Sequence, residues 1–124
     1  MISMAEKKID FDTVREIGFG LPDVEEGTMY GAPCLKARGK MFACIPTHRS
    51  AEPHSLVVRI DFEKREVLLS ASPGIYYLKD HYVSYPCVLV RLKRIRRDEL
   101  GKLLGMAWSF VTAKTRPVKR RRSR

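Results

Sequence analysis

The apolar positions near the start of the chain recur with the period of an amphipathic helix. Phe11, Val14 and Ile17 fall three residues apart and form one apolar stripe. Asp10 or Asp12 can cap this helix, because a short side-chain oxygen accepts the unpaired N–H groups of a first turn. Two glycines and a proline at positions 18–22 predict where the helix ends.

A second and stronger helical pattern lies near the end of the chain. Asp98 is placed to cap it, and Pro117 marks the latest position at which it can end. The spacing i, i+3, i+4, i+7, i+8 and i+11 predicts a buried stripe made of Leu100, Leu103, Leu104, Ala107, Trp108 and Val111.

Between these helices the pattern changes to the two-residue alternation of β-strands. It is clearest over residues 55–61 and 87–95, where branched apolar residues alternate with polar ones. The other strands predicted from alternation and turn residues cover residues 25–30, 34–38, 41–45 and 75–78.

The segments between these strands are shorter and more polar. Asp61 can cap a short helix over residues 62–70, with Phe62 and Leu69 as its apolar anchors. Residues 46–53 and 79–86 are predicted as connecting segments, and the second of these is rich in aromatic side chains.

This order of elements predicts one α+β domain over residues 1–113. Sequential strands with short turns favour an antiparallel sheet, and the N- and C-terminal helices then cover one face of it in a two-layer sandwich. The opposite face would present the outward strand positions, which include the basic residues Lys36, Arg38, Arg59, Arg91 and Lys93. These residues form either a basic binding surface or a solubilising one.

The charge of the chain is concentrated in its last residues. The net charge is +10 over 124 residues, and residues 114–124 carry seven basic side chains and no acidic one, which leaves +3 for residues 1–113. We expect residues 114–124 to be a disordered tail. Concentrated positive charge favours polyanions such as nucleic acid, and the alternative is a tail that serves solubility alone.

Several functional classes are disfavoured by the composition. The sequence has no apolar run long enough to cross a membrane and no signal-like apolar stretch near its start, so we expect a cytoplasmic protein without a membrane partner. The three cysteines, Cys34, Cys44 and Cys87, form no C-x-x-C pair and are read as buried thiols.

No catalytic or cofactor-binding motif is present, and we expect neither enzymatic activity nor a cofactor. His48 and His54 lie in one polar loop with spacing that does not suit zinc, so no metal site is predicted. A thiol mechanism would need His81 to act as the base for Cys87, which opens an apolar strand. The tyrosines can either stack on bases or bury their rings at strand ends; they are Tyr30, Tyr76, Tyr77, Tyr82 and Tyr85.

The chain also resembles the MmcQ/YjbR-like family over about residues 10–111. The resemblance rests on ordered stretches that include FDTVREI at 11–17, YGAP at 30–33, LVVR at 56–59, DHY at 80–82 and VLVRL at 88–92. It implies a CyaY-like α+β fold, described for the family as a double wing, and a DNA-binding role without defined catalytic residues. The matched positions that would form the binding surface are Lys36, Lys40, Arg59, His81, Tyr82 and Arg91.

Our first hypothesis is therefore a DNA-binding protein of low sequence specificity, with double-stranded DNA as its partner. Phosphate contacts position a protein without specifying sequence, and no base-reading helix is evident. The residues predicted to make the contacts are Lys36, Arg38, Lys40, Arg59, His81, Tyr82, Arg91, Lys93, Lys119, Arg120, Arg121 and Arg122.

Two alternatives remain open. The domain can be a non-enzymatic interaction or regulatory module that binds a protein or a small anionic ligand on the sheet. It can also be an enzyme of unrecognised type, in which case activity would depend on His81 or Cys87.

Overall fold

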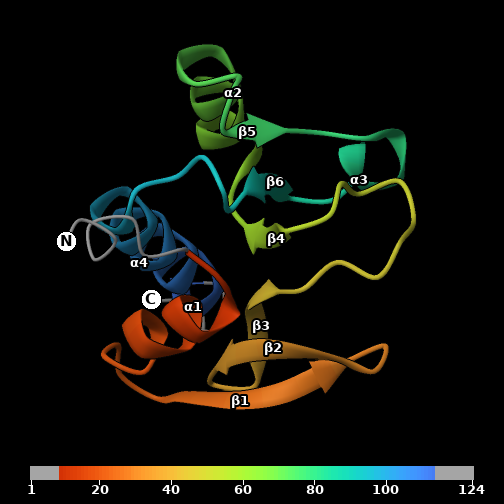
Figure 1. The fold of residues 1–124 in the computed structure, drawn as a ribbon. Helices are drawn as coiled ribbons and strands as arrows, with labels where there is room; N and C mark the ends of the chain where they lie inside the picture. Colours follow the sequence, from red (N-terminus) through yellow and green to blue (C-terminus); the bar gives the residue numbers. More distant parts are fainter. Residues whose placement is uncertain (1–8, 114–124) are drawn as a thin grey trace, which may run out of the picture.

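The structure is a computed structural model that describes residues 9–113, and within them six strands form one antiparallel sheet (Figure 1). The strand order is β1-β2-β3-β4-β6-β5. The strands are β1 (Val24–Met29), β2 (Ala32–Ala37), β3 (Lys40–Cys44), β4 (Ser55–Arg59), β5 (Tyr76–Tyr77) and β6 (Cys87–Arg91). The helices are α1 (Phe11–Gly18), α2 (Phe62–Ala71), α3 (Asp80–Val83) and α4 (Arg97–Ala113).

The first helix begins at a reciprocal cap. The Asp10 carboxylate accepts the backbone N–H of Thr13 at 3.2 Å, and the Thr13 hydroxyl accepts the backbone N–H of Asp10 at 3.3 Å. Two donors that a helix start leaves unpaired are satisfied in this way. Of the two caps that the sequence allowed, Asp10 is therefore the one used.

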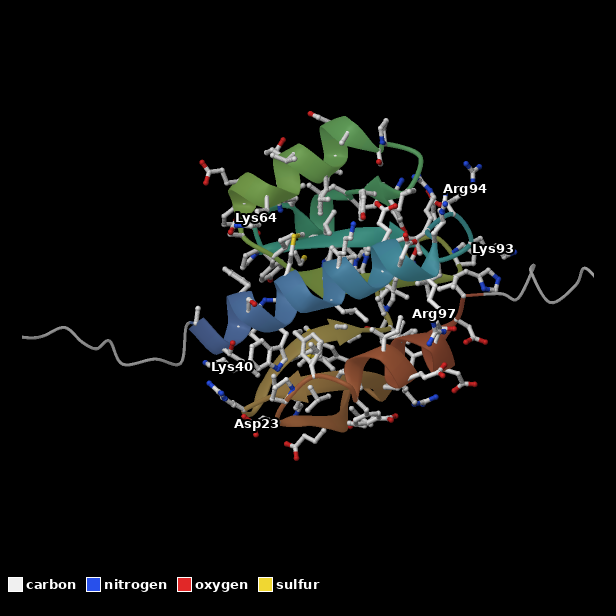
Figure 2. All side chains as sticks on the ribbon, turned by 90° about the vertical axis from the view of Figure 1, so that its left-hand side faces the viewer. Asp23, Lys40, Lys64, Lys93, Arg94 and Arg97 are labelled. Carbon is white, nitrogen blue, oxygen red and sulfur yellow. The ribbon has the colours of Figure 1, made fainter. Side chains whose placement is uncertain are left out.

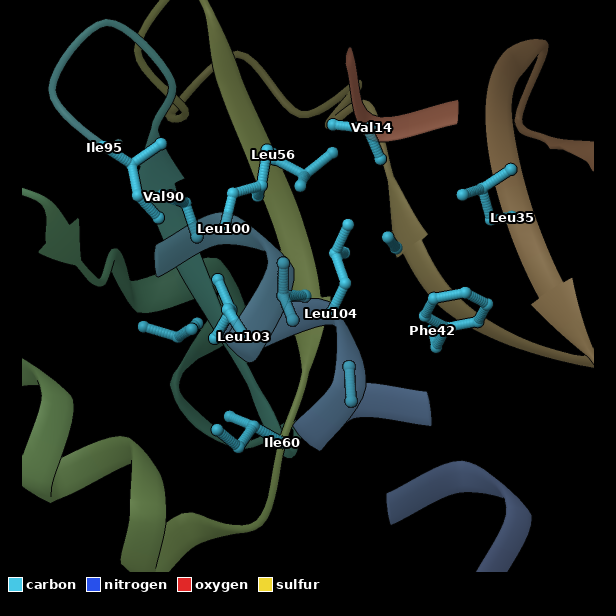
Figure 3. Packing of buried hydrophobic residues seen from close by; sticks show 14 of the residues in the cluster. Val14, Leu35, Phe42, Leu56, Ile60, Val90, Ile95, Leu100, Leu103 and Leu104 are labelled. Carbon is cyan, nitrogen blue, oxygen red and sulfur yellow. The ribbon is translucent and has the colours of Figure 1, made fainter. Parts of the chain in front are cut away.

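The main core lies between the sheet and its two terminal helices. Figure 1 shows α1 and α4 on the same side of the sheet, and α4 crosses β3 and β4. The fully buried Leu100, Leu103 and Leu104 of α4 pack among apolar side chains of the strands (Figure 3). The predicted two-layer α+β sandwich is confirmed, and the helix-facing positions of β4, Leu56 and Val58, are those that alternation indicated.

The opposite face of the sheet, here called the outer face, is not a bare polar surface. A second cluster of buried side chains lies on it, and α3 packs against β6 there. Its buried members are Cys34, Cys44, Val57, Tyr77, Tyr82, Cys87 and Leu89. All three thiols therefore lie on the outer face, between the strands and the segments that cover them.

Two boundaries near the last helix differ from the sequence prediction. β6 ends at Arg91, before residue 95, because Arg94 N–H bonds back to the Arg91 carbonyl and turns the chain. α4 begins at Arg97, so Asp98 lies in the first turn and is not the cap. The predicted limit at Pro117 and the predicted tail lie outside the described residues.

Two connecting segments also differ from the prediction. Residues 79–86, expected to be a connector, contain the one-turn helix α3. In α2 the predicted anchor Phe62 is 47% exposed, and the buried residue of this helix is Arg65. Arg65 is buried because its Nη1 atom donates hydrogen bonds to three backbone carbonyls within residues 83–87, although its Nε atom has no hydrogen-bond partner among the described residues.

No helix in the described part of the chain is long and apolar enough to cross a membrane.

Candidate functional site

The floor of the candidate site is formed by neighbouring strands of the outer face. The register places Cys44 of β3 opposite Val57 of β4, and Arg59 of β4 opposite Cys87 of β6. Because side chains alternate along a strand, Val57 and Arg59 point to the same face. The four side chains line one cleft.

Three segments distant in the sequence form the walls of this cleft. They are the β1–β2 hairpin with Met29 and Tyr30, the chain that follows β3 up to His48, and the α3 segment with His81 and Tyr85. The volume enclosed is about 640 Å³, which is within the usual range for small-molecule sites. We refer to this feature as the outer cleft.

Arg59 is the cation of the outer cleft, and its charge is left unneutralised. Its Nε atom is buried and donates to no hydrogen-bond acceptor among the described residues. Within residues 9–113 no carboxylate forms an ion pair with it. A buried donor without an acceptor costs free energy, and the cost is larger when the group is charged.

Aromatic rings surround the mouth of the outer cleft. The imidazoles of His48 and His81 stack in parallel, with centroids 3.7 Å apart and an angle of 10° between the planes. The Tyr82 ring meets His81 edge-on at 4.8 Å, and the Tyr85 ring lies 6.4 Å from His81. Tyr30 and Tyr85 are 89% and 56% exposed, so their ring faces are available to a ligand.

His48 is held in its neutral form. Its Nδ1 accepts the backbone N–H of Ser50 at 3.1 Å, so the ring proton of the neutral form lies on Nε2. Burial and the neighbouring His81 lower the pKa of His48, because both disfavour a second proton on the ring. The stacked pair is therefore not a doubly charged site at neutral pH.

The thiols of the cleft floor are protonated. Burial raises the pKa of Cys44 to about 12, and burial also raises the pKa of Cys87 although Arg59 and Arg65 lie near it. The Cys87 thiol donates to the Tyr82 carbonyl at 3.9 Å. A nucleophilic cysteine needs a lowered pKa, so these thiols have the properties of core residues.

The structure brings together three of the predicted contact residues and separates the others. Arg59, His81 and Tyr82 all line the outer cleft. Lys36 lies on β2 with its stem against Gly27 of β1, and a Cβ built on that glycine would be 3.1 Å from the Lys36 Cε atom. Lys36 is part-buried and does not line the cleft.

Two predicted contact residues are already paired with acidic side chains. Arg91 donates to both carboxylate oxygens of Glu52 at 2.9 Å, and its guanidinium lies 4.4 Å from the Tyr77 ring centroid. Arg38 pairs with Asp23 at 3.1 Å and lies 5.7 Å from the Trp108 ring centroid. Their charges are therefore neutralised within the fold.

The last two predicted lysines in the described part of the chain lie at opposite ends of the molecule. Figure 2 shows Lys93 near the start of α4 and Lys40 at the other end of this helix. The residues Lys119, Arg120, Arg121 and Arg122 lie outside the described residues. The members of the predicted set that lie within residues 9–113 therefore do not form one continuous basic face.

Some residues of the cleft had no clear signal in the sequence. The pairing of His48 with His81 joins a loop to α3 across more than thirty positions, and no local pattern reports it. Met29 and Met41 also line the cleft and were not predicted. Of the tyrosines considered for stacking, Tyr76 and Tyr77 are buried, whereas Tyr30 and Tyr85 are exposed beside the cleft.

The described residues contain no group of three or more histidine, cysteine or acidic side chains that could hold a metal ion.

Comparison with known structures finds the crystal structure of a Deinococcus radiodurans protein, DR2400, with a domain of the DUF419 family model. It is 24% identical in sequence, with a TM-score of 0.70, and the match covers 86% of this chain and 81% of that one. It shows that the fold is shared.

Comparison with curated proteins finds uncharacterized proteins of Mycobacterium tuberculosis and Mycobacterium bovis that are 36% identical over 72 residues. The match covers 55% of this chain and 56% of each relative, so the chain spans about half the length of the curated relatives it matches. The YjbR family model matches residues 19–110, a range that contains every residue of the outer cleft. The chain belongs to the YjbR family.

Proposed function

We propose that this domain is a binding protein without catalytic activity, and that the outer cleft takes a small anionic ligand. The observation that carries the proposal is the buried Nε atom of Arg59, a charged donor that belongs to a lining residue of the cleft and has no acceptor among the described residues. A bound anion would supply this acceptor. Hydrogen bonds between a guanidinium and an anion are shorter and stronger than neutral ones.

The side chains that line the outer cleft support an anion over a cation. They include the Arg59 guanidinium, and no aspartate or glutamate of the described residues is among them. Arg91, on the neighbouring strand, has no comparable capacity, because Glu52 already occupies its guanidinium.

The state of the thiols supports binding without chemistry. Cys44 and Cys87 are protonated by burial, and Cys87 donates its proton to a backbone carbonyl. If the cleft were instead the site of a thiol enzyme, Cys87→Ala would abolish an activity that a binding protein does not have.

A thermal-shift measurement with simple anions tests the proposal. Benzoate, octanoate and phosphate are added at millimolar concentration to the wild-type protein, to Arg59→Met and to Arg94→Met, which removes an exposed arginine outside the cleft. Because a ligand that binds only the native state raises Tm, at least one anion is expected to stabilise the wild type and Arg94→Met but not Arg59→Met. Equal shifts in all three proteins would show that the anions do not use the cleft.

Binding of duplex DNA is a second candidate function, and the distribution of charge favours it. The turn before α4 carries four basic residues in five positions, Lys93–Arg97, and Figure 2 shows Lys93, Arg94 and Arg97 together at this end of the molecule. Residues 114–124 add seven basic residues. Phosphate contacts from such segments give affinity without sequence preference.

A further inference from the structure

We infer that the ligand of the outer cleft is a planar aromatic monoanion, such as an aromatic carboxylate, whose charged group meets Arg59 and whose ring stacks at the mouth. This inference rests on the proposed function, since it names the class of anion that the same site takes. Its evidence is the charge, the polarity and the ring geometry of the side chains that line the cleft.

The charge of the lining favours a single negative charge on the ligand. Arg59 is the one arginine among the described lining residues, and no lysine is present there. His48 is neutral, because its Nδ1 accepts the Ser50 N–H and its pKa is lowered. A carboxylate that pairs with one guanidinium is satisfied, whereas each further negative group would be desolvated without a partner.

The rest of the lining favours an apolar body. Met29, Met41 and Val57 line the same cleft as Arg59, and so do Cys44 and Cys87, whose thiols are protonated. Methionine side chains are flexible and polarizable, and sulfur makes favourable contacts with aromatic rings. A sugar or a polyhydroxylated chain would bury hydroxyl groups against these side chains and lose hydrogen bonds to water.

The rings at the mouth favour a flat body over a flexible one. His48 and His81 come from different segments and already align their ring faces to within 10°. Tyr85, 56% exposed, lies beside His81 at 6.4 Å between ring centroids. A planar ligand can extend this stack, and offset stacking of rings contributes beyond the burial of area.

Calorimetric titration with three matched probes tests the inference on the full chain. Naphthalene-2-carboxylate has the ring and the charge, octanoate has the charge without a ring, and naphthalene-2-carboxamide has the ring without the charge. We expect naphthalene-2-carboxylate to bind about fivefold or more tightly than either of the others, which corresponds to one stacking contribution and one charge-assisted pair.

Substitutions at the mouth separate stacking from simple burial. Tyr85→Leu and His81→Leu each put an apolar side chain in place of a ring, so each is expected to reduce the preference for naphthalene-2-carboxylate over octanoate by about threefold. Phe19→Leu is the matched control, because Phe19 is 49% exposed and lies outside the cleft. It is expected to leave the preference unchanged.

The outcomes distinguish this inference from the proposal on which it rests. If octanoate and naphthalene-2-carboxylate bind equally and both are lost in Arg59→Met, the anion cleft stands and the aromatic specificity is wrong. If the carboxamide binds as tightly as the carboxylate, the cleft does not recognise the charge of the ligand, and the inference that the ligand is a monoanion is wrong. If none of the three probes binds but phosphate still stabilises the wild type and not Arg59→Met, the inference alone fails. If no anion binds in either experiment, the proposed function fails as well.

Discussion

Two arginines on neighbouring strands of the outer face differ in whether their guanidinium groups already have partners within the fold. Arg91 of β6 has a bidentate carboxylate partner in Glu52, two backbone carbonyls and the face of Tyr77. Arg59 of β4 has a buried nitrogen that lacks a partner in the described structure. Both positions are outward in the sequence pattern, so the pattern alone could not tell a structural arginine from a binding one.

The Arg91–Glu52 pair gives a testable dependence on pH. Hydrogen bonds from Arg91 lower the pKa of Glu52 below its ordinary value. A lowered folded-state pKa stabilises the fold above the unfolded-state pKa, and this stabilisation is lost as pH falls through the folded-state pKa. Glu52→Gln is therefore expected to be less stable than the wild type at neutral pH, with the gap closing below about pH 4. Urea unfolding of the wild type and Glu52→Gln between neutral pH and about pH 4 measures the difference in stability. A difference that does not change with pH would show that the Glu52 carboxylate does not stabilise the fold through Arg91.

A glycine at the end of α1 provides a test of the main core. A Cβ added at Gly18 would lie 2.4 Å from Leu35 Cδ1 and 4.0 Å from Phe42 Cζ. Gly18→Ala is therefore expected to destabilise the protein by about 1–3 kcal/mol through overpacking. The matched variant is Gly105→Ala in α4, where the added methyl meets no atom within 4 Å. Gly105→Ala is expected to stabilise the protein by about 0.5–1 kcal/mol. Chemical unfolding of both variants measures whether the free energy of unfolding falls in Gly18→Ala and rises in Gly105→Ala.

At the scale of elements, the wall of the outer cleft depends on a buried arginine from another helix. Arg65 of α2 is 6% exposed, and its Nη1 donates to the carbonyls of Val83, Tyr85 and Cys87 at 3.1, 2.9 and 3.3 Å. Backbone hydrogen bonds also hold this chain: Tyr85 N–H donates to the Tyr82 carbonyl at 3.1 Å, and Cys87 N–H donates to the Tyr85 carbonyl at 2.8 Å. The Arg65 guanidinium adds a side-chain support to the wall that carries Tyr85.

Removing the Arg65 guanidinium is expected to loosen this wall. Arg65→Met keeps the apolar stem but leaves the carbonyls unpaired, which predicts a destabilisation of about 1–3 kcal/mol. Hydrogen exchange of residues 80–87 is expected to accelerate more than that of β4. Lys64→Met is the control on the same helix, because Lys64 makes an exposed ion pair with Asp61 that contributes little. Unchanged exchange in Arg65→Met would show that the wall is held by other contacts.

The helices and strands could be predicted from the sequence where their apolar residues recur with a regular helical or strand spacing. The two terminal helices and the strands around Val57 and Leu89 have long, regular apolar patterns, and each was found with shifted ends. The helix α3 has four residues, too few for a helical period to appear in the sequence. The buried Arg65 was not predictable either, because its partners are carbonyls about twenty residues away.

At the scale of the whole molecule, the outer cleft exists only because the fold brings three distant segments together. No local sequence pattern links the segments that form it, which are the β1–β2 hairpin, the chain after β3 and the α3 segment. The family resemblance named Arg59, His81 and Tyr82 as candidate contact residues, and all three line the outer cleft. The predicted set of contact residues also included Arg38, Lys40, Arg91 and Lys93, whereas the fold pairs or separates these four.

The charge of the whole molecule predicts how duplex DNA would bind. A labelled duplex is titrated with the full chain and with a chain ending at Ala113, at about 50, 150 and 300 mM salt. Salt is varied because the logarithm of the affinity falls with the logarithm of the salt concentration, with a slope of about 0.9 for each phosphate contact. We expect the shortened chain to lose most binding by the middle salt concentration, because only +3 of the net +10 remains. Strong binding by the shortened chain at the middle concentration would make the folded domain itself a nucleic-acid binder.

A map of backbone amide chemical shifts during titration with naphthalene-2-carboxylate shows directly whether the outer cleft binds this ligand. We expect the largest changes in residues 44–48, at Arg59 and in residues 80–87, and we expect Arg59→Met to abolish them. Changes centred on Lys93–Arg97, or spread evenly over the surface, would contradict the claim that the outer cleft is the binding site of this protein.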